Sequence, residues 1–143
     1  MSKVIPKITF IVVVLLGFYT QVVKAKAETE IIVSKSHQRM IVHSSEGSYS
    51  WPVSTARRGY YTPTGVFYPY SLQPMHYSRK YDNSPMPWSI FFSGGFAIHG
   101  TGAVENLGRP ASHGCVRLHP ANARTLYDIV SRDRHNTTIR IIN

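Results

Sequence analysis

A succession of short β-type runs, broken by proline and glycine, most constrains what this chain can fold into. From Glu30 onward the apolar and β-branched residues come in short runs separated by turn residues, which is typical of a mainly β domain. The pair Gly94-Gly95 indicates a hairpin, and Pro52 indicates an edge position or a bulge. The runs predicted as strands are 31–36, 39–44, 49–55, 66–70, 89–92, 96–99 and 137–142.

A helical period is convincing in one segment near the C-terminus. Ala123, Leu126, Tyr127 and Val130 follow the i, i+3, i+4, i+7 spacing of an amphipathic helix. Pro120 stands where a proline in the first turn of a helix is tolerated. Since 143 residues leave room for one domain and little else, the sequence predicts a single domain, mainly β, with one helix.

The segment 72–88 differs from the runs around it. It contains Pro74, Pro85 and Pro87 together with a polar stretch, and we predict a long irregular loop here. Its aromatic residues argue against plain disorder. We therefore expect a lid or a substrate-binding loop, and the alternative is that its tyrosine and tryptophan side chains belong to the core.

The N-terminus has the pattern of an export signal. Lys3 and Lys7 precede an uncharged apolar run, residues 8–23, and Ala25-Lys26-Ala27 supplies the small-x-small pattern of a cleavage site. We predict a signal peptide over residues 1–27 and a mature domain over 28–143. The alternative is an uncleaved membrane anchor; both place the domain outside the cytoplasm, in the periplasm or its equivalent.

The formal net charge of the whole chain is +9. Four of its lysines lie in the predicted signal, so residues 28–143 carry twelve basic and seven acidic residues, a formal charge of +5. No basic stripe with a recognition motif is present, and we expect no nucleic-acid partner. A moderately basic surface suits an anionic cell-wall polymer, or serves solubility alone.

Cys115 is the single cysteine, so the domain has no internal disulfide. A lone thiol in an exported domain is a candidate nucleophile, which requires a base nearby and a site for the oxyanion it creates. His99 ends a predicted strand sixteen residues earlier, which is enough chain for a loop to return to it. Gly114 immediately before the cysteine permits a tight turn whose N–H groups point together.

His99-Gly100 followed by Ser112-His113-Gly114-Cys115-Val116-Arg117 resembles the signature of the YkuD-type L,D-transpeptidase catalytic domain, a family of peptidoglycan enzymes. The upstream Thr62-Pro63-Thr64-Gly65 also resembles a segment of these domains. The resemblance covers roughly residues 31–142. It implies the β-sandwich or barrel-like L,D-transpeptidase catalytic fold, with one helix after the cysteine motif.

The resemblance also implies roles for the motif residues. Cys115 is the nucleophile, His99 is the general base and later the general acid, and Gly114 with Cys115 supplies the backbone N–H donors for the oxyanion. Ser112 and His113 shape the substrate site, although direct acid–base work by His113 stays open.

Two further residues of the signature need comment. Arg117 is our own assignment for holding a substrate carboxylate, because a guanidinium binds a carboxylate with two hydrogen bonds. Gly100 departs from the family, which often has serine there; a backbone carbonyl at this position would still orient the imidazole.

The implied reaction transfers an acyl group between peptidoglycan stem peptides without a cofactor or metal. The thiol attacks the L,D bond of a tetrapeptide stem, D-Ala leaves, and an amine takes the acyl group. The amine of a neighbouring stem gives a 3-3 cross-link, a lysine of an outer-membrane protein gives attachment to the wall, and water gives a carboxypeptidase or endopeptidase. The function alternatives from other classes are a non-catalytic wall-binding protein and a His2Cys metal site formed by His99, His113 and Cys115.

Overall fold

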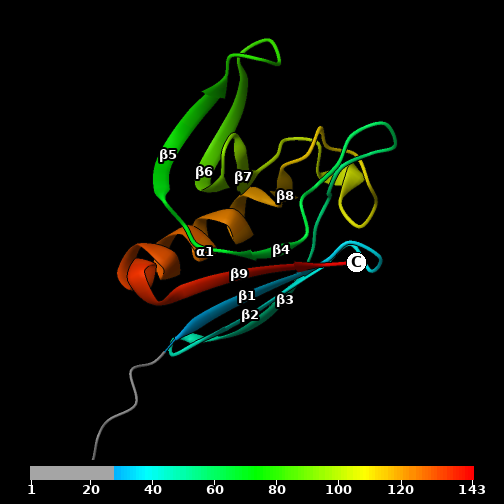
Figure 1. Ribbon diagram of the computed structural model, residues 1–143. Helices are drawn as coiled ribbons and strands as arrows, with labels where there is room; N and C mark the ends of the chain where they lie inside the picture. The colour runs from blue at the N-terminus through cyan, green and yellow to red at the C-terminus, as the bar shows by residue number, and fades with distance from the viewer. Residues whose placement is uncertain (1–27) are drawn as a thin grey trace, which may run out of the picture.

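The computed structural model describes residues 28–143, so the predicted signal peptide lies outside the described residues. The described part is mainly β with one α-helix, which confirms the predicted class. Nowhere in residues 28–143 is a helix long and apolar enough to cross a membrane. Two sheets and the helix form three layers (Figure 1).

The first sheet has five strands in the order β3-β2-β1-β9-β4. β1 and β2 form an antiparallel hairpin, and Pro52 ends the edge strand β3, in agreement with its predicted edge position. The last strand, β9, pairs in parallel with β1, with Thr29 opposite Thr137 and Ser34 opposite Ile142. The strands are β1 (Thr29–Ser34), β2 (Arg39–Ser44), β3 (Gly47–Pro52), β4 (Gly65–Phe67) and β9 (Thr137–Ile142).

The second sheet has four strands in the order β5-β6-β7-β8. The turn at Gly94-Gly95 joins β6 to β7 as predicted, and β7 pairs in parallel with β8, a short strand that the sequence did not predict. The strands are β5 (Ser71–Ser78), β6 (Ser84–Ser93), β7 (Phe96–Gly100) and β8 (Val116–Leu118), and two 3-10 helices are η1 (Val104–Asn106) and η2 (Arg134–Asn136).

The prediction of an irregular loop over residues 72–88 is wrong, because this segment forms most of an antiparallel hairpin of β5 and β6. Pro74 lies on the edge strand, where a missing N–H costs little. Pro85 and Pro87 lie two residues apart, so their nitrogens face the same edge of β6, and β7 pairs only with residues from Ile90 onward. The prolines therefore occupy places that a sheet tolerates, and the proline count alone was misleading.

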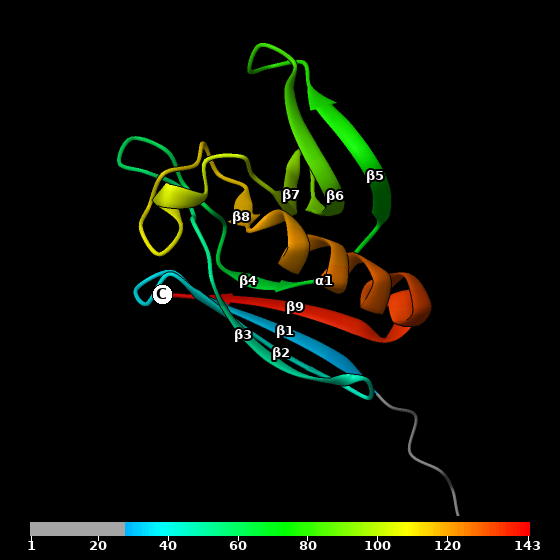
Figure 2. The same ribbon diagram turned by 180° about the vertical axis from the view of Figure 1, so that it is seen from behind.

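The helix α1 (Pro120–Asp133) begins at Pro120, as predicted, and the His119 side chain caps it by accepting a hydrogen bond from the Ala121 N–H. Figures 1 and 2 show α1 between the two sheets. The core is continuous across both sheets and the helix. Its largest fully buried side chains include Ile31, Met40, Ile90, Ile98, Leu118, Leu126, Ile139 and Ile141.

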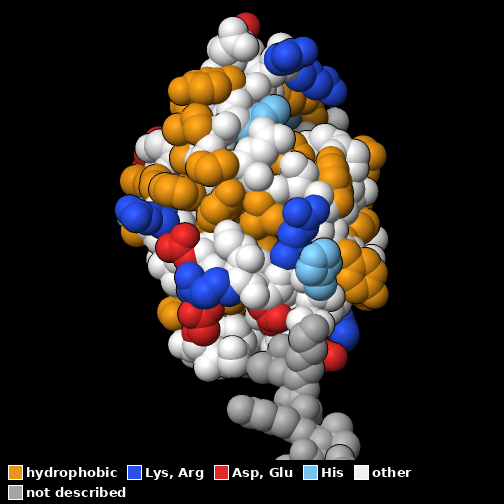
Figure 3. Space-filling view, turned by 90° about the vertical axis from the view of Figure 1, so that its left-hand side faces the viewer, with side chains coloured by type: hydrophobic (Ala, Val, Ile, Leu, Met, Phe, Trp, Pro, Cys, Tyr) orange, Lys and Arg blue, Asp and Glu red, His pale blue; other side chains and the backbone are white. Residues whose placement is uncertain are grey.

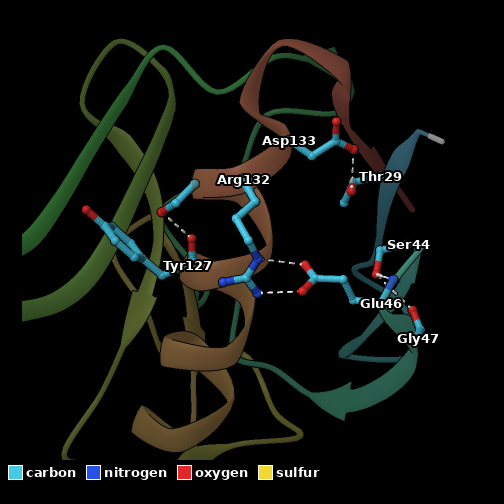
Figure 4. A network of polar contacts seen from close by, with 8 residues as sticks. Thr29, Ser44, Glu46, Gly47, Tyr127, Arg132 and Asp133 are labelled. Atoms are coloured by element: carbon cyan, nitrogen blue, oxygen red, sulfur yellow. Dashed lines mark hydrogen bonds and ion pairs between the residues drawn. The ribbon is translucent and has the colours of Figure 1, made fainter. Parts of the chain in front are cut away.

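The C-terminal end of α1 is tied to the five-stranded sheet by polar contacts (Figure 4). Arg132 pairs with Glu46 of the β2–β3 turn at 2.7 Å. The Thr29 hydroxyl on β1 donates to the Asp133 carboxylate at 2.9 Å. These contacts fix the end of the helix against one sheet, while its start lies beside the other.

Hydrophobic side chains are also spread over the surface on the side where β5 and α1 lie (Figure 3). Tyr68, Tyr70, Met75 and Tyr77, from β5 and the segment before it, are exposed. Met75 and Tyr77 lie on an edge strand, and most of the core lies on the other strands.

Candidate active site

The register of β7 and β8 brings the predicted catalytic residues to one face of the sheet. His99 is opposite Arg117, and Cys115 stands two residues before Arg117. Paired residues, and residues two apart on a strand, project from the same face. Cys115 directly precedes β8 and packs against the cluster that contains Ala97, two residues before His99 on β7. Val116, between Cys115 and Arg117, points into the core and is fully buried. The sheet thus places His99, Cys115 and Arg117 together on the face away from the main core.

His99 is buried, and its Nδ1 lies 2.7 Å from the carbonyl oxygen of Gly100. A carbonyl oxygen only accepts, so Nδ1 carries the proton and Nε2 keeps a free lone pair. Burial lowers the pKa of His99 to about 4; the hydrogen bond to Gly100 opposes this, while the positive charges of Arg117 and His76 add to it. The imidazole is therefore neutral at physiological pH and oriented by its backbone partner.

Cys115 is partly exposed, and its Sγ lies 3.8 Å from the carbonyl oxygen of Gly95. Burial raises the pKa of the thiol, although a backbone hydrogen bond with Ala97 and the positive charge of Arg117 act in the opposite direction. Phe91 and Ala97, with Met86, form the small apolar cluster against which the cysteine packs. The resting site therefore holds a neutral thiol and a neutral imidazole on the same face of the sheet.

The turn before Cys115 is held by Ser112, which is fully buried. Its Oγ donates to the Cys115 carbonyl oxygen at 2.6 Å and accepts from the Gly114 N–H at 3.0 Å. The prediction that the Gly114 N–H serves the oxyanion conflicts with this geometry, since that donor is already bound to Ser112. Within residues 28–143, the N–H groups of His113 and Cys115 have no acceptor in the turn.

Gly114 has φ of +141°, a conformation that L side chains rarely adopt. A Cβ at this position would lie 2.6 Å from Cε1 of Phe96 and 2.9 Å from the carbonyl oxygen of Tyr61. The glycine is therefore required twice, by its backbone conformation and by the close approach of two other segments.

His113 points to the rim of the site, where three side chains hold it. Its ring stacks on Tyr81 at 4.0 Å between centroids and meets the edge of Tyr60 at 4.8 Å. Arg57 Nη2 lies 3.0 Å from His113 Nε2 and donates to it. Burial lowers the pKa of His113, and the charges of Arg57, Arg117 and Lys80 add to this. The Nε2 lone pair of His113 is therefore engaged by Arg57.

Arg117 is half-buried, and its Nη1 lies 3.4 Å from the Ala111 carbonyl oxygen. Burial lowers its pKa, which the neighbouring Cys115 opposes and Arg57 reinforces. The backbone of Arg117 bonds to that of Ser54 in both directions, at 2.9 and 3.1 Å. The guanidinium thus stands beside the thiol on a backbone anchored from both sides.

The model of the L,D-transpeptidase catalytic domain (YkuD) matches residues 28–141. The chain belongs to the L,D-transpeptidase catalytic-domain family. No curated protein sequence matches the chain.

Solved L,D-transpeptidases share the fold. One from Mycobacterium smegmatis superposes with a TM-score of 0.73 at 20% identity, over 82% of this chain and 59% of that one. One from Mycobacterium tuberculosis H37Rv superposes with a TM-score of 0.74 at 19% identity, over 82% of this chain and 58% of that one. One from Stackebrandtia nassauensis superposes with a TM-score of 0.71 at 27% identity, over 83% of this chain and 57% of that one. This chain therefore spans less than two thirds of each of these structures.

The departure from the family at Gly100 has a packing reason. A Cβ there would lie 3.1 Å from Cγ of Pro87 and 3.2 Å from Cα of Pro120. The hairpin and the start of α1 therefore close over this position, leaving little room for serine. The Gly100 carbonyl accepts from His99 without any side chain, as the sequence suggested.

Within the described residues, no three His, Cys, Asp or Glu side chains converge to hold a metal ion. The proposed His2Cys set is divided by its contacts, since His99 faces the Gly100 carbonyl and His113 faces Arg57. A cation beside His113 also disfavours a second cation there.

The structure adds residues that sequence reasoning missed. The buried Thr62 donates to the Gly114 carbonyl oxygen at 2.7 Å and accepts from the Ala56 N–H, so it supports the cysteine turn from behind. The resemblance of Thr62-Pro63-Thr64-Gly65 to the family signature was the available signal. Nothing in the sequence indicated Arg57 or Tyr81. The segment after β3 and the tip of the β5–β6 hairpin bring them to His113 only in the folded chain.

Proposed function

We propose that this protein is a cysteine-dependent peptidoglycan L,D-transpeptidase, with Cys115 as nucleophile and His99 as general base. The observation that supports it most is the β7–β8 register, which places a partly exposed thiol and a neutral imidazole on one face. The family match adds the reaction class.

The charge states favour proton transfer during attack over a preformed ion pair. The raised pKa of Cys115 and the lowered pKa of His99 both disfavour a thiolate–imidazolium pair at rest. The thiol therefore gives its proton to His99 Nε2 as Sγ attacks the substrate carbonyl. Burial then favours rapid loss of that proton from the imidazolium.

The proton goes next to the leaving group. Sγ forms a bond with the carbonyl carbon between the diaminoacyl residue and D-Ala, and the carbon–nitrogen bond breaks as His99 protonates the departing amine. A thioester remains on Cys115. The acceptor amine attacks it, His99 takes the amine proton, and the thiol is restored when the new amide forms.

The oxyanion of both steps needs donors, and the turn offers them at His113 and Cys115 in place of Gly114. Each such N–H lowers the barrier by about 3 kcal/mol when it is aimed at the developing charge. Arg117 adds a positive charge next to Cys115. Ser112 is a positioning residue here, because it is fully buried and reaches the substrate only through the turn that it holds.

The acceptor and the place of action belong to the proposal. The candidate acceptors are the amine of a second stem, a lysine of an outer-membrane protein and water, and the products distinguish them. Export through the signal predicted at residues 1–27 would bring the domain to its wall substrate.

Intact mass spectrometry tests the proposal. The purified protein is incubated with a diaminopimelate-type disaccharide tetrapeptide, with and without a second stem as acceptor. A thioester adduct on Cys115 that is discharged into a cross-linked product supports the transpeptidase. Discharge to water alone indicates a carboxypeptidase, and a folded protein that forms no adduct indicates a wall-binding role.

Three variants assign the residues. Cys115→Ser is expected to form no adduct, and His99→Gln to slow acylation by on the order of 10²-fold or more. His135→Gln is the matched control, because this exposed histidine lies in η2 and not in the motif. Acylation by Cys115→Ser at the wild-type rate would contradict the assignment of the nucleophile.

A further inference from the structure

Three positive side chains converge on the rim of the site without an acidic partner. Across residues 28–143, the ion pairs formed are Arg132–Glu46 and Arg140–Glu30. Arg57, Lys80 and Arg117 therefore have no carboxylate partner in the described chain. Like charges gathered in this way repel one another and cost stability unless something negative joins them.

His113 lies among the three cations. Arg57 hydrogen-bonds to its Nε2, and Arg117 and Lys80 are close enough to act on its charge. Tyr81 stacks on the ring, and Lys80 Nζ lies 5.5 Å from the centroid of Tyr81. The cations come from three separate parts of the fold: the segment after β3, the tip of the β5–β6 hairpin, and β8.

Aromatic side chains flank His113 and the cations around it. Tyr60 and Tyr81 flank the ring, and the Arg57 guanidinium lies 5.1 Å from the centroid of Tyr60. Arg57 is exposed, and Nη2 is the only one of its guanidinium nitrogens with a hydrogen bond in the described residues. The rest of its planar fork is free for a ligand outside the protein.

We propose that Arg57 and Lys80, arranged around His113, form a subsite for a free carboxylate of the donor stem and select stems that are not amidated. The inference rests on the proposed function and adds the specificity of the same site. A guanidinium recognises a carboxylate with two hydrogen bonds, whereas a carboxamide offers one acceptor, no charge and an N–H2 group that the cation repels.

A diaminopimelate-type stem offers two such carboxylates next to the scissile bond. One belongs to the isoglutamyl residue and the other to the side-chain end of the diaminopimelyl residue. Amidation of either removes its charge with almost no change in shape. Stems amidated at one or both positions are therefore matched probes of the subsite.

The experiment compares acylation of the purified protein by four tetrapeptide stems: unmodified, amidated at the isoglutamyl group, amidated at the diaminopimelyl group, and amidated at both. Wild type is expected to lose about tenfold in kcat/KM when the recognised carboxylate is amidated, mainly through KM. The singly amidated stems identify which carboxylate binds. Added salt should reduce the preference, because the contact lies on an exposed rim.

Variants then assign the preference to residues. Arg57→Gln should lower kcat/KM about tenfold more for the unmodified stem than for the doubly amidated stem. Arg57→Lys should keep part of the preference, and Lys80→Gln should reduce it about threefold. Arg58→Gln is the control, because Arg58 is an exposed neighbour with no contact to His113.

Two results would overturn the inference while leaving the proposed function intact. One is equal acylation of wild type by all four stems. The other is an equal loss for all stems in Arg57→Gln, which would show that Arg57 only holds His113 in place. If no stem acylates Cys115, the proposed function itself fails, and the inference with it.

Discussion

The two sheets of this domain differ in regularity, and the irregular one holds the site. In the five-stranded sheet, β1 pairs with β9 over six consecutive positions without a break. In the four-stranded sheet, the pairing skips Pro74 and Trp88, and the register shifts between Phe91 and Ser93. Among residues 28–143, four non-glycine residues have positive φ, and three of them, Asp82, Asn83 and Trp88, lie in the β5–β6 hairpin.

The regular sheet supports the fold, and the irregular sheet carries the candidate site. The regular sheet buries its side chains in the core and ties down the end of α1. The irregular sheet directs His99, Cys115 and Arg117 away from the core and carries the hairpin tip to His113. Changes in the first should therefore act on stability alone, and changes in the second on stability and acylation together.

The largest contrast is expected between two glycines with nearly the same backbone conformation. Gly114 has φ of +141° and Gly47, in the β2–β3 turn, has φ of +143°, but only Gly114 is crowded. Gly114→Ala should lower the free energy of unfolding by on the order of 3 kcal/mol and the rate of thioester formation on Cys115 by about 10²-fold. Gly47→Ala should cost about 1 kcal/mol through its backbone alone.

Urea unfolding and the rate of thioester formation measure this contrast. Gly47→Ala carries the same conformational strain, so it separates strain from crowding by Phe96 and Tyr61. An equal loss in the free energy of unfolding in both variants would show that crowding at Gly114 does not destabilise the alanine variant.

A smaller contrast compares the buried hydroxyl of Ser112, in the turn before β8, with that of Thr29 on β1. Ser112→Ala leaves the Gly114 N–H and the Cys115 carbonyl without their partner, so about 2 kcal/mol of stability and about tenfold in acylation should be lost. Thr29→Val removes one hydrogen bond to Asp133, which keeps Asn136 as a donor. It should cost about 1 kcal/mol and leave acylation unchanged. Wild-type acylation by Ser112→Ala would contradict the positioning role.

The next contrast is in the pH dependence of stability. His99 has its pKa lowered to about 4 in the folded state, so below the ordinary histidine pKa the unfolded chain binds more protons. Its contribution is complete above pH of about 6.5 and is lost as the pH falls toward about 4, amounting to about 1 kcal/mol by pH of about 6.

Urea titrations at several pH values measure this slope. It should be shallower in His99→Gln, whereas His43→Gln on the exposed side of β2 should keep the wild-type slope. Equal slopes in wild type and His99→Gln would contradict a buried neutral imidazole.

The smallest effect is expected at the Arg132–Glu46 pair. Both side chains are largely exposed, 58% and 41%, so solvent and salt screen the attraction. Arg132→Gln should leave the melting temperature and the acylation rate unchanged within error. A clear drop in melting temperature would show that the tie between α1 and the β2–β3 turn counts for more than an exposed ion pair.

The same division explains what the sequence could predict. Strand β9, the Gly94-Gly95 turn and α1 were recovered because each follows a local pattern of spacing or turn residues. The β5–β6 hairpin was missed because its prolines lie where a strand has a partner on one side only. Sequence spacing does not show which strands lack a second partner. The three residues of β8 are too few for a period to show.

The site divides in the same way. The nearness of His99 and Cys115 was visible in their spacing along the chain, and the parallel pairing of β7 with β8 realises it. The occupied N–H of Gly114 was not visible, because it depends on the rotamer of Ser112. The contacts of His113 depend on segments 57–60 and 79–83, which meet it only after both sheets have formed.

The parallel pairing of β1 with β9 has a consequence for the order of folding. The centre of the five-stranded sheet joins Thr29 to Thr137, so it cannot close until the last strand has left the ribosome. Until then the β1–β2–β3 meander has an unpaired edge at β1, and β4 has no neighbour in its sheet. Contacts between residues so distant in the sequence make folding slow, on a scale of about milliseconds to seconds. The catalytic residues at positions 99–117 are therefore synthesised before β9, the strand that completes their supporting sheet.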